Sequence, residues 1–416
     1  MAVAVPTFST VEQIAKRLKR KDTPQVEIVG PWGSGKTLLP LQIAAQLDAP
    51  LLFITAGRLE AEGIHDDLCT FSDEDQTALF PAWEVLPSDT MNPADDIVAE
   101  RMNTLKRLSA ARDSGATMMA VAPLRSLLQY VVNRKRLAED SLALTVGEEY
   151  DLDELLARFV SMGYSRETMV EHRGDISVRG GIVDVFPISS ELPYRVEFFG
   201  DEIDTIRCFE PETQRSVSQE DSLQILPRSE KALLASKDAT SQFTALTDYF
   251  PKGTIIVLDE PLRLEEVAQE LTEQLGGSDY HLPWDEAREK LAKFKQIHIA
   301  QIGYDRHDDT PRFQAPMQSI TGWAGHSGDF WAQLKEWDLQ NFSVQLLCVN
   351  TGERRRLYEL LEEQGYRPGE DAFDLQISIG RLQAGFTANA EKLAVLSERE
   401  MFGRHYMRRK RRRFEA

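Results

Sequence analysis

Short apolar runs and helical periodicities alternate along the first part of the chain. Residues 25–29, 50–55 and 117–122 are short and mainly apolar, the pattern of strands buried on both faces of a sheet. Residues 37–47 and 95–108 have apolar positions spaced three and four apart, as in a helix that covers a core. Strands that alternate with helices in this way predict a parallel sheet in an α/β layer fold.

The start of the chain carries a separate helix signal. Ser9 and Glu12 have the spacing of a capping box, in which two side chains satisfy backbone donors at a helix N-terminus. We therefore expect an amphipathic helix that begins at Ser9 and runs to Lys19.

After about residue 140 the pattern changes to a period of two. A helical stretch at 151–162 is followed by "DISVRGGIVDVFP" and "YRVEFFGDEIDTIRCFEP", in which apolar and polar residues alternate. Gly180-Gly181 and Gly200-Asp201 are dipeptides that suit tight hairpin turns. This stretch predicts an antiparallel α+β insert within the α/β layer fold.

The α/β pattern returns with "TIIVL" at 254–258 and a further strand near Ile297. Residues 308–328 are polar and rich in turn formers and predict a linker, after which a last small α/β unit follows. The expected fold is a RecA-like P-loop domain interrupted by the antiparallel insert and followed by a second small α/β domain. The expected parts are the first section of the P-loop domain (1–140), the insert (141–227), the second section (228–315), the small domain (322–400) and a basic tail (401–416).

A complete phosphate-loop motif lies between the first predicted strand and its helix. "GPWGSGKT" at 30–37 satisfies G-x-x-x-x-G-K-[ST], in which backbone N–H groups surround a phosphate and the helix N-terminus favours negative charge. We expect this loop to bind ATP, with Thr37 on Mg²⁺; the alternative is a glycine turn of similar spelling without nucleotide affinity. The residues expected to contact the nucleotide are Gly30, Gly33, Ser34, Gly35, Lys36 and Thr37.

Hydrolysis needs carboxylates that position Mg²⁺ and water, and an arginine that stabilises the transition state. Asp259 and Glu260 follow a buried strand and are the candidates for the carboxylates, although acids are also common at ordinary strand exits. Gln376–Arg381 approaches an arginine-finger motif, but its spacing is off by one, and it is better interpreted as a strand that turns at Gly380. The sequence therefore favours nucleotide binding without efficient autonomous turnover.

Composition narrows the class of protein. The 416 residues are 42% hydrophobic and 28% charged, no apolar run approaches the roughly 18 residues of a membrane span, and the three cysteines form no C-x-x-C pair. These features predict a globular, cytoplasmic protein without a membrane partner or a metal site. A net charge of −19 disfavours a free-standing nucleic-acid binder. The last thirteen residues hold seven Lys and Arg, however, and predict either a contact with nucleic acid or an acidic partner, or a solvated linker.

One long stretch of the insert is specific enough to indicate a family. "RGGIVDVFPISSELPYRVEFFGDEIDTIRCFEPETQRS" resembles the UvrA-interaction module shared by UvrB and the bacterial transcription-repair coupling factors (Mfd). "PAWEVLPSDTMNPADDIVAERMNTLKRL" and "GFTANAEKLAVLSEREMFGR" extend the resemblance over about Thr23 to Arg404. The aromatic β-hairpin of UvrB is absent near "MMAVAPLRSLLQYVV", so the chain resembles the UvrB-like N-terminal part of Mfd more than UvrB itself.

The resemblance implies a partner and a site. It implies UvrA as the partner, with contacts at Arg166, Arg179 and Glu197, while a further UvrB arginine falls on Ser177 here. The alternative is that Arg179 and Glu197 form only an internal cross-strand pair. RNA polymerase and DNA are implied as partners of the full-length factor through other domains, and we expect this chain to be a fragment or a truncated relative.

The resemblance and the glycine loop predict different functions. In Mfd the first domain commonly has a degraded phosphate loop, whereas the loop here is complete. The family predicts a scaffold that recruits UvrA in excision repair. The loop predicts an ATP-binding or ATP-hydrolysing, helicase-like lobe that acts on DNA.

Overall fold

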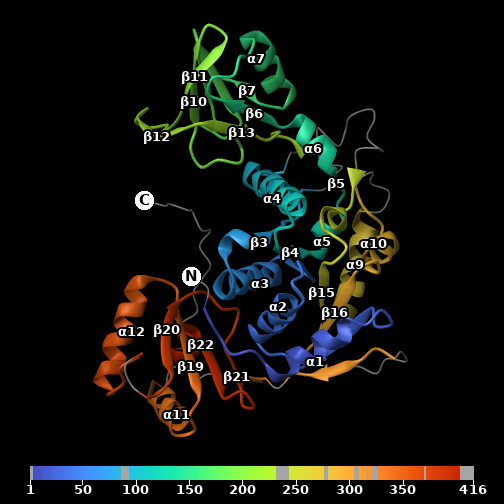
Figure 1. Ribbon diagram of the computed structural model, residues 1–416, viewed down its shortest axis with the longest axis vertical. Coiled ribbons are helices and arrows are strands. Elements are labelled where there is room, and N and C mark those ends of the chain that lie inside the picture. Colours follow the sequence, from blue (N-terminus) through green and yellow to red (C-terminus); the bar gives the residue numbers. More distant parts are fainter. Residues whose placement is uncertain are drawn as a thin grey trace.

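The computed structural model describes residues 3–85, 93–230, 243–275, 280–303, 309–315, 317–320, 327–369 and 372–402 (Figure 1). Its largest sheet has seven parallel strands, and the glycine loop follows one of them. Their spatial order is β17 (Arg312–Gln314), β1 (Gln25–Val29), β16 (Lys295–Ala300), β15 (Ile255–Asp259), β2 (Leu51–Thr55), β4 (Met119–Pro123) and β3 (Thr77–Leu79).

Helices cover both faces of this sheet, because its strands are apolar on both sides. In β2, Leu52 and Ile54 belong to one core cluster, and Leu51 and Phe53 belong to the other. The first core is closed by α4 (Asp95–Ser114), α5 (Leu124–Leu127), α9 (Pro261–Leu275) and α10 (Trp284–Leu291), and the second by α1 (Ser9–Leu18), α2 (Gly35–Leu47) and α3 (Arg58–Phe71).

The insert forms a separate sheet with its own core (Figure 1). Gly180 and Gly200 have φ of +61° and +67° and allow the tight turns between its hairpin strands. The strand order is β12 (Ser216–Glu220), β11 (Glu202–Phe209), β10 (Tyr194–Phe199), β9 (Ile182–Val185), β8 (Asp175–Arg179) and β7 (Ser165–Arg166), and α7 (Leu152–Ser161) completes the core. The insert is entered and left through the antiparallel pair β6 (Leu142–Thr145) and β13 (Ser222–Ile225).

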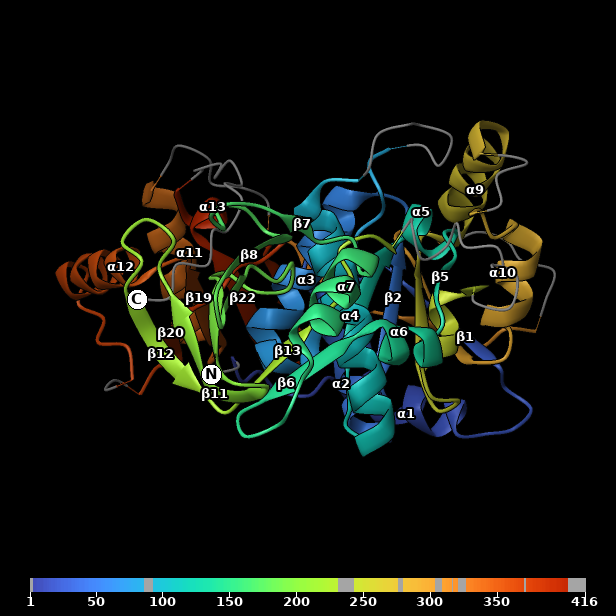
Figure 2. The same ribbon diagram turned by 90° about the horizontal axis from the view of Figure 1, so that it is seen from above.

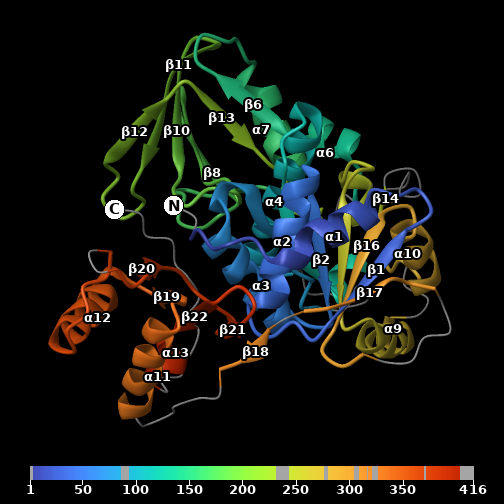
Figure 3. The same cartoon turned by 60° about the horizontal axis from the view of Figure 1, so that its bottom comes forward.

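The last unit, residues 327–402, packs against the α/β layer of the seven-stranded sheet (Figure 3). Its sheet has the order β21 (Phe386–Ala388), β22 (Leu393–Ser397), β19 (Ser343–Cys348) and β20 (Leu375–Ile379), and β18 (Gln318–Ser319), which precedes the unit in sequence, is added at the β21 edge. The helices of the unit are α11 (Ser327–Leu339), α12 (Thr351–Glu363) and α13 (Glu398–Phe402). Phe386 and Val395 belong to the same core cluster as α1, α2 and α3. The third unit therefore shares apolar packing with the helices next to the glycine loop.

Short elements join these layers. They are η1 (Glu74–Gln76) before β3, β5 (Val131–Val132) paired with β14 (Phe243–Thr244), α6 (Arg134–Asp140) before the insert, and η3 (Leu246–Tyr249) before β15. Seen from above, the insert lies in front of the central layer and the third unit lies at its left side (Figure 2). Arg173 and Arg228 link the insert and its exit to Asp96 and Asp95 of α4.

Most expected elements are present, and two expectations are wrong. The capping box is absent, because Ser9 is the first residue of the helix and Phe8, which has no polar side chain, is its N-cap. Ser9 Oγ donates to Glu391 instead, and Glu12 pairs with Lys16. The stretch 308–328 is not only a linker, since Arg312–Gln314 pairs with β1 and Gln318–Ser319 pairs with β21. Of the helices that the structure describes, none is long and apolar enough to cross a membrane. The domain limits stay predictions, and the basic tail from residue 403 lies outside the described residues.

Candidate functional site

The glycine loop joins β1 to α2, as the sequence predicts. Gly30 and Gly33 have φ of +74° and +52°, a region that L side chains rarely adopt. The N–H of Gly35 donates to the carbonyl of Trp32 at 3.0 Å, and the N–H of Lys36 donates to that of Gly33 at 3.2 Å. These bonds turn the chain directly into the first turn of α2.

Lys36 and Asp259 form an ion pair beside this loop. Lys36 Nζ lies 2.8 Å from Asp259 Oδ2, and their side chains are 19% and 7% exposed. Glu260 has φ of +54°, and its Oε1 accepts the backbone N–H of Gln301 at 2.7 Å. The structure thus brings Asp259 to the loop lysine, while Glu260 contacts Gln301, the first residue after β16.

Asp67 on α3 is the buried partner of the loop hydroxyls. Ser34 Oγ donates to its Oδ1 at 2.6 Å, and Thr37 Oγ1 donates to its Oδ2 at 2.8 Å. Burial raises the pKa of Asp67 to about 7, although hydrogen bonds from Ser34, the N–H of Gln383 and Thr37 oppose the shift. The Thr37 hydroxyl, expected to bind Mg²⁺, is therefore occupied by a carboxylate of the protein.

The segment 381–386, here called the capping segment, lies on the glycine loop. The N–H of Ser34 donates to the carbonyl of Ala384 at 2.8 Å. The N–H of Gln383 donates to Asp67 Oδ1 at 2.9 Å and to Ser34 Oγ at 3.0 Å. A Cβ placed on Gly33 would lie 2.4 Å from the Ala384 oxygen. Backbone of the third unit therefore fills the space directly above the loop.

These contacts decide whether the loop fits ATP and Mg²⁺ in this arrangement. A phosphate cradle needs free backbone donors and a lysine that reaches the anion. Here the Ser34 N–H is used by Ala384, Lys36 is paired with Asp259, and Thr37 is bonded to Asp67. The residues have the right types, but as arranged they do not fit a nucleotide.

The polar face of the insert sheet carries two of the three residues expected to contact UvrA. The register pairs Arg179 with Ile182 and Ile182 with Glu197, so all three lie in one row across the sheet. Arg179 is exposed, and its Nη2 donates to the carbonyl of Thr168 at 3.1 Å. Glu197 pairs with Arg207 at 2.6 Å. The alternative of an Arg179–Glu197 pair is wrong, because each side chain has a different partner.

Arg166 and Ser177 lie near this row but differ from it. Arg166 is on the edge strand β7 and pairs in register with Ile176, whose side chain is in the core. Arg166 is exposed and outside the row of Arg179 and Glu197. Ser177 is buried and donates to the carbonyl of Thr168 at 2.9 Å. Ser177 stands where UvrB has an additional arginine. Here its hydroxyl bonds to the Thr168 carbonyl, which is also the acceptor for Arg179.

A charged pair and an exposed ring complete the polar face. Arg195 makes a bidentate contact with Asp184, at 2.7 and 2.9 Å, and lies over the ring of Phe209. At the end of β10, Phe199 is 83% exposed. The face thus combines a rigid ion pair, an exposed arginine and an exposed aromatic side chain.

Two parts of the glycine-loop site are missed by sequence reasoning. Asp67 carried a signal, because it lies in the apolar stripe of α3 with Ile64, Leu68 and Phe71, where a charged residue is unusual. The capping segment gave no such signal, since its contacts with Ser34 and Asp67 are made by backbone atoms 316 to 350 residues away in sequence.

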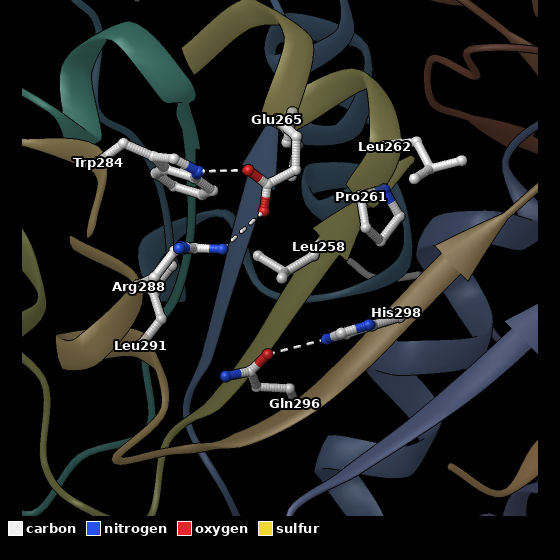
Figure 4. A pocket seen from close by; sticks show the side chains of 10 residues that line it. Leu258, Pro261, Leu262, Glu265, Trp284, Arg288, Leu291, Gln296 and His298 are labelled. Atoms are coloured by element: carbon white, nitrogen blue, oxygen red, sulfur yellow. Dashed lines mark hydrogen bonds and ion pairs between the residues drawn. The ribbon is translucent and has the colours of Figure 1, made fainter. Parts of the chain in front are cut away.

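A cavity of about 300 Å³ lies between α9, α10 and the strands β15 and β16 (Figure 4). Glu265 accepts Trp284 Nε1 at 2.6 Å, and His298 Nε2 lies 2.8 Å from Gln296 Oε1. The polar groups that line it are bonded to one another. None of the expected nucleotide or UvrA residues lines this cavity.

The fold is thus a parallel α/β layer that carries a glycine loop and an inserted, mainly antiparallel domain, whose edge strand β7 pairs with β8 in parallel. The sequence model of the UvrB interaction domain family matches residues 142–230, which contain the whole insert sheet. The transcription-repair-coupling factor of Bacillus subtilis (strain 168) is 23% identical over 90% of this chain and 38% of its own length. That of Mycobacterium tuberculosis (strain CDC 1551 / Oshkosh) is 36% identical over 60% of this chain and 20% of its own.

These matches bear out the resemblance drawn from the sequence. The chain is similar to the N-terminal, UvrB-like region of the transcription-repair-coupling factors, with a UvrB interaction domain at 142–230. It aligns with less than two-fifths of the length of these relatives.

Proposed function

We propose that this chain acts in transcription-coupled repair and that its UvrB interaction domain recruits UvrA. The observation that carries the proposal is the match of residues 142–230 to that domain family, together with the polar face that its sheet presents. On this face, and among the residues that the structure describes, Arg179 contacts the carbonyl of Thr168. Its guanidinium keeps free donors for a carboxylate of a partner.

The other groups of the face suit an interface with a protein. Phe199 offers an exposed aromatic surface at the end of the same sheet, and arginine and aromatic side chains often dominate binding energy. Glu197 is held by Arg207 and can accept from a partner through its second oxygen. Arg166 lies at the edge strand, outside the row, and we assign it a peripheral contact.

Charge reversal tests this proposal. Arg179→Glu should weaken binding to UvrA at least tenfold, because it replaces five donors with a like charge facing a carboxylate. The control is Arg355→Glu, since Arg355 is 84% exposed on α12, in the third unit, and lies outside the insert. Equal binding of UvrA by wild type and Arg179→Glu in a pull-down would show that Arg179 does not contact UvrA.

A second function, ATP binding at the glycine loop, is favoured by a separate observation. Only β16 lies between the strand that precedes the loop and the strand that ends at Asp259, which is the arrangement expected of a RecA-like P-loop lobe. Lys36 and Asp259 are 2.8 Å apart, so a lysine for phosphate and an acid for Mg²⁺ meet at one edge. In this proposal the capping segment moves away before the nucleotide binds.

Titration with ATP and Mg²⁺ tests the second function. Wild type should bind, and Lys36→Ala should lose most of the affinity because it removes the phosphate-binding charge. Equal and negligible binding by both proteins would reject nucleotide binding. Contacts with RNA polymerase and DNA stay predictions for the longer coupling factors, and a cytoplasmic location stays a prediction for this chain.

A further inference from the structure

The capping segment holds the glycine loop at its phosphate-binding donors. The Ala384 carbonyl oxygen accepts the N–H of Ser34 at 2.8 Å, as an anion oxygen would. Met317, in the connection to β18, lies against Gly35, where an added Cβ would be 2.2 Å from its sulfur. An anion at the loop and these groups would compete for the same space.

The capping segment is anchored on both sides of this contact. On one side Thr70 Oγ1 donates to the carbonyl of Arg381 at 2.8 Å and accepts the N–H of Arg381 at 2.9 Å. Gly380 packs on Thr70 so closely that a Cβ would lie 2.6 Å from its Cγ2. On the other side Phe386 enters the core of α1 and α2. The docked position is therefore specified by side chains as well as by backbone.

We propose that the capping segment is a latch: polyphosphate binding at the glycine loop and docking of the unit 327–402 exclude each other. This proposal rests on the second function, ATP binding. To bind, a nucleotide has to replace the Ala384 carbonyl as the acceptor of the Ser34 N–H, and Asp259 as the partner of the Lys36 ammonium group. Because linkage is reciprocal, a docked unit weakens nucleotide binding, and a bound nucleotide releases the unit by the same factor.

The latch also explains why the loop has a complete phosphate-binding motif although its groups, in the docked arrangement, do not fit a nucleotide. If the open state is a small fraction of the molecules, the apparent dissociation constant rises by the inverse of that fraction. Loosening the latch should therefore raise affinity without any change in the loop itself. Thr70→Ala removes both bonds to Arg381 and leaves residues 30–37 intact.

A reversible disulfide tests the latch directly. A Cβ on Gly63 would lie 3.2 Å from Gln383 Cγ. The Gln383 Cβ is one bond from that atom, so we expect Gly63→Cys with Gln383→Cys to place two β-carbons close enough for a disulfide, which needs roughly 3.5–4.5 Å. The same change removes the Gln383 amide, which would otherwise clash with the new Cβ. Each single-cysteine variant, treated with the same oxidant, controls for the native thiols, including Cys69.

The oxidised double variant should bind ATP with Mg²⁺ at least tenfold more weakly than its own reduced form. Thr70→Ala should bind at least threefold more tightly than wild type. ATP should slow formation of the disulfide, and Lys36→Ala should abolish that effect.

Other results separate the two proposals. Equal ATP binding by the oxidised and reduced forms would overturn the latch and leave nucleotide binding standing. Absence of binding in every form, Thr70→Ala included, would overturn nucleotide binding and the latch together. Failure of the disulfide to form in nucleotide-free protein would show that the capping segment does not dock, and the latch would again be wrong.

Discussion

The backbone N–H of Ser34 donates to the carbonyl oxygen of Ala384 at 2.8 Å, across 350 residues of sequence. The contact places the third unit on the one loop whose motif suggests nucleotide chemistry. Whether the donors of this loop are available to a phosphate therefore cannot be inferred from residues 30–37 alone.

Gly33 tests the closeness of this contact. Gly33→Ala should destabilise the protein by more than the roughly 1–2 kcal/mol of a left-handed alanine, because its Cβ would also meet Ala384 at 2.4 Å. Hydrogen exchange of the N–H groups of Gln383 and Ala384 should accelerate. Thermal unfolding and exchange of both proteins provide the measurement.

Gly147→Ala is the matched control, since Gly147 has φ of +85° and nothing within 4 Å of an added Cβ. It carries the same kind of backbone strain without a clash. If the two variants lose the same stability and residues 383–384 exchange as in wild type, the close contact at Gly33 is wrong.

Asp67 predicts a pH dependence of stability. Its pKa is raised from 3.8 to about 7, chiefly by burial, with the charge of Asp66 as a smaller cause in the same direction. Between these values the folded protein holds a proton that the unfolded chain has released, so the group's contribution is complete below about pH 4 and is lost as the pH rises towards 7.

Asp67→Asn resembles the protonated acid and should not show this loss. Urea unfolding of wild type and Asp67→Asn from pH 4 to pH 8 measures the difference. Wild type should lose stability relative to the variant up to about pH 7, after which the difference should level. A difference that does not change with pH would show that Asp67 does not titrate in this range.

The ion pair between Arg101 and Glu230 predicts a large loss of stability. Both side chains are fully buried, Arg101 Nε lies 2.7 Å from Glu230 Oε2, and the guanidinium also stacks on Phe80. Arg101→Ala leaves a buried carboxylate unpaired, which typically costs about 3–5 kcal/mol.

Chemical denaturation measures this loss. Arg58→Ala is the control, because Arg58 makes two ion pairs but is half exposed, and surface pairs contribute roughly 0–1 kcal/mol. If Arg101→Ala and Arg58→Ala lost similar free energies of unfolding, burial of the Arg101–Glu230 pair would not be the cause of the loss.

The sequence predicts local structure here far better than it predicts contacts. The strand β1, the helix α2 and the hairpin turns at Gly180 and Gly200 follow from periodicity and turn chemistry. Ser9 and Glu12 satisfied a local capping rule, but Glu391 of the third unit provides the partner of Ser9 instead. Local rules fail where a distant segment offers a better bond.

The same reason limits the prediction of the sites. The types of residue in the glycine loop are visible in the sequence, but their use by Asp67, Asp259 and Ala384 depends on tertiary packing. On the insert, alternation alone places Arg179 and Glu197 on the polar face. Their separate partners, Thr168 and Arg207, depend on strand register and on a loop conformation.

We expect the polar face of the insert sheet to bind UvrA. The most direct measurement is hydrogen exchange of this chain with and without UvrA. UvrA should protect the amides of β8, β9 and β10, around Arg179 and Glu197, and Arg179→Glu should lose that protection. Protection confined to the 327–402 unit or to the α/β layer, with these strands unchanged, would contradict it.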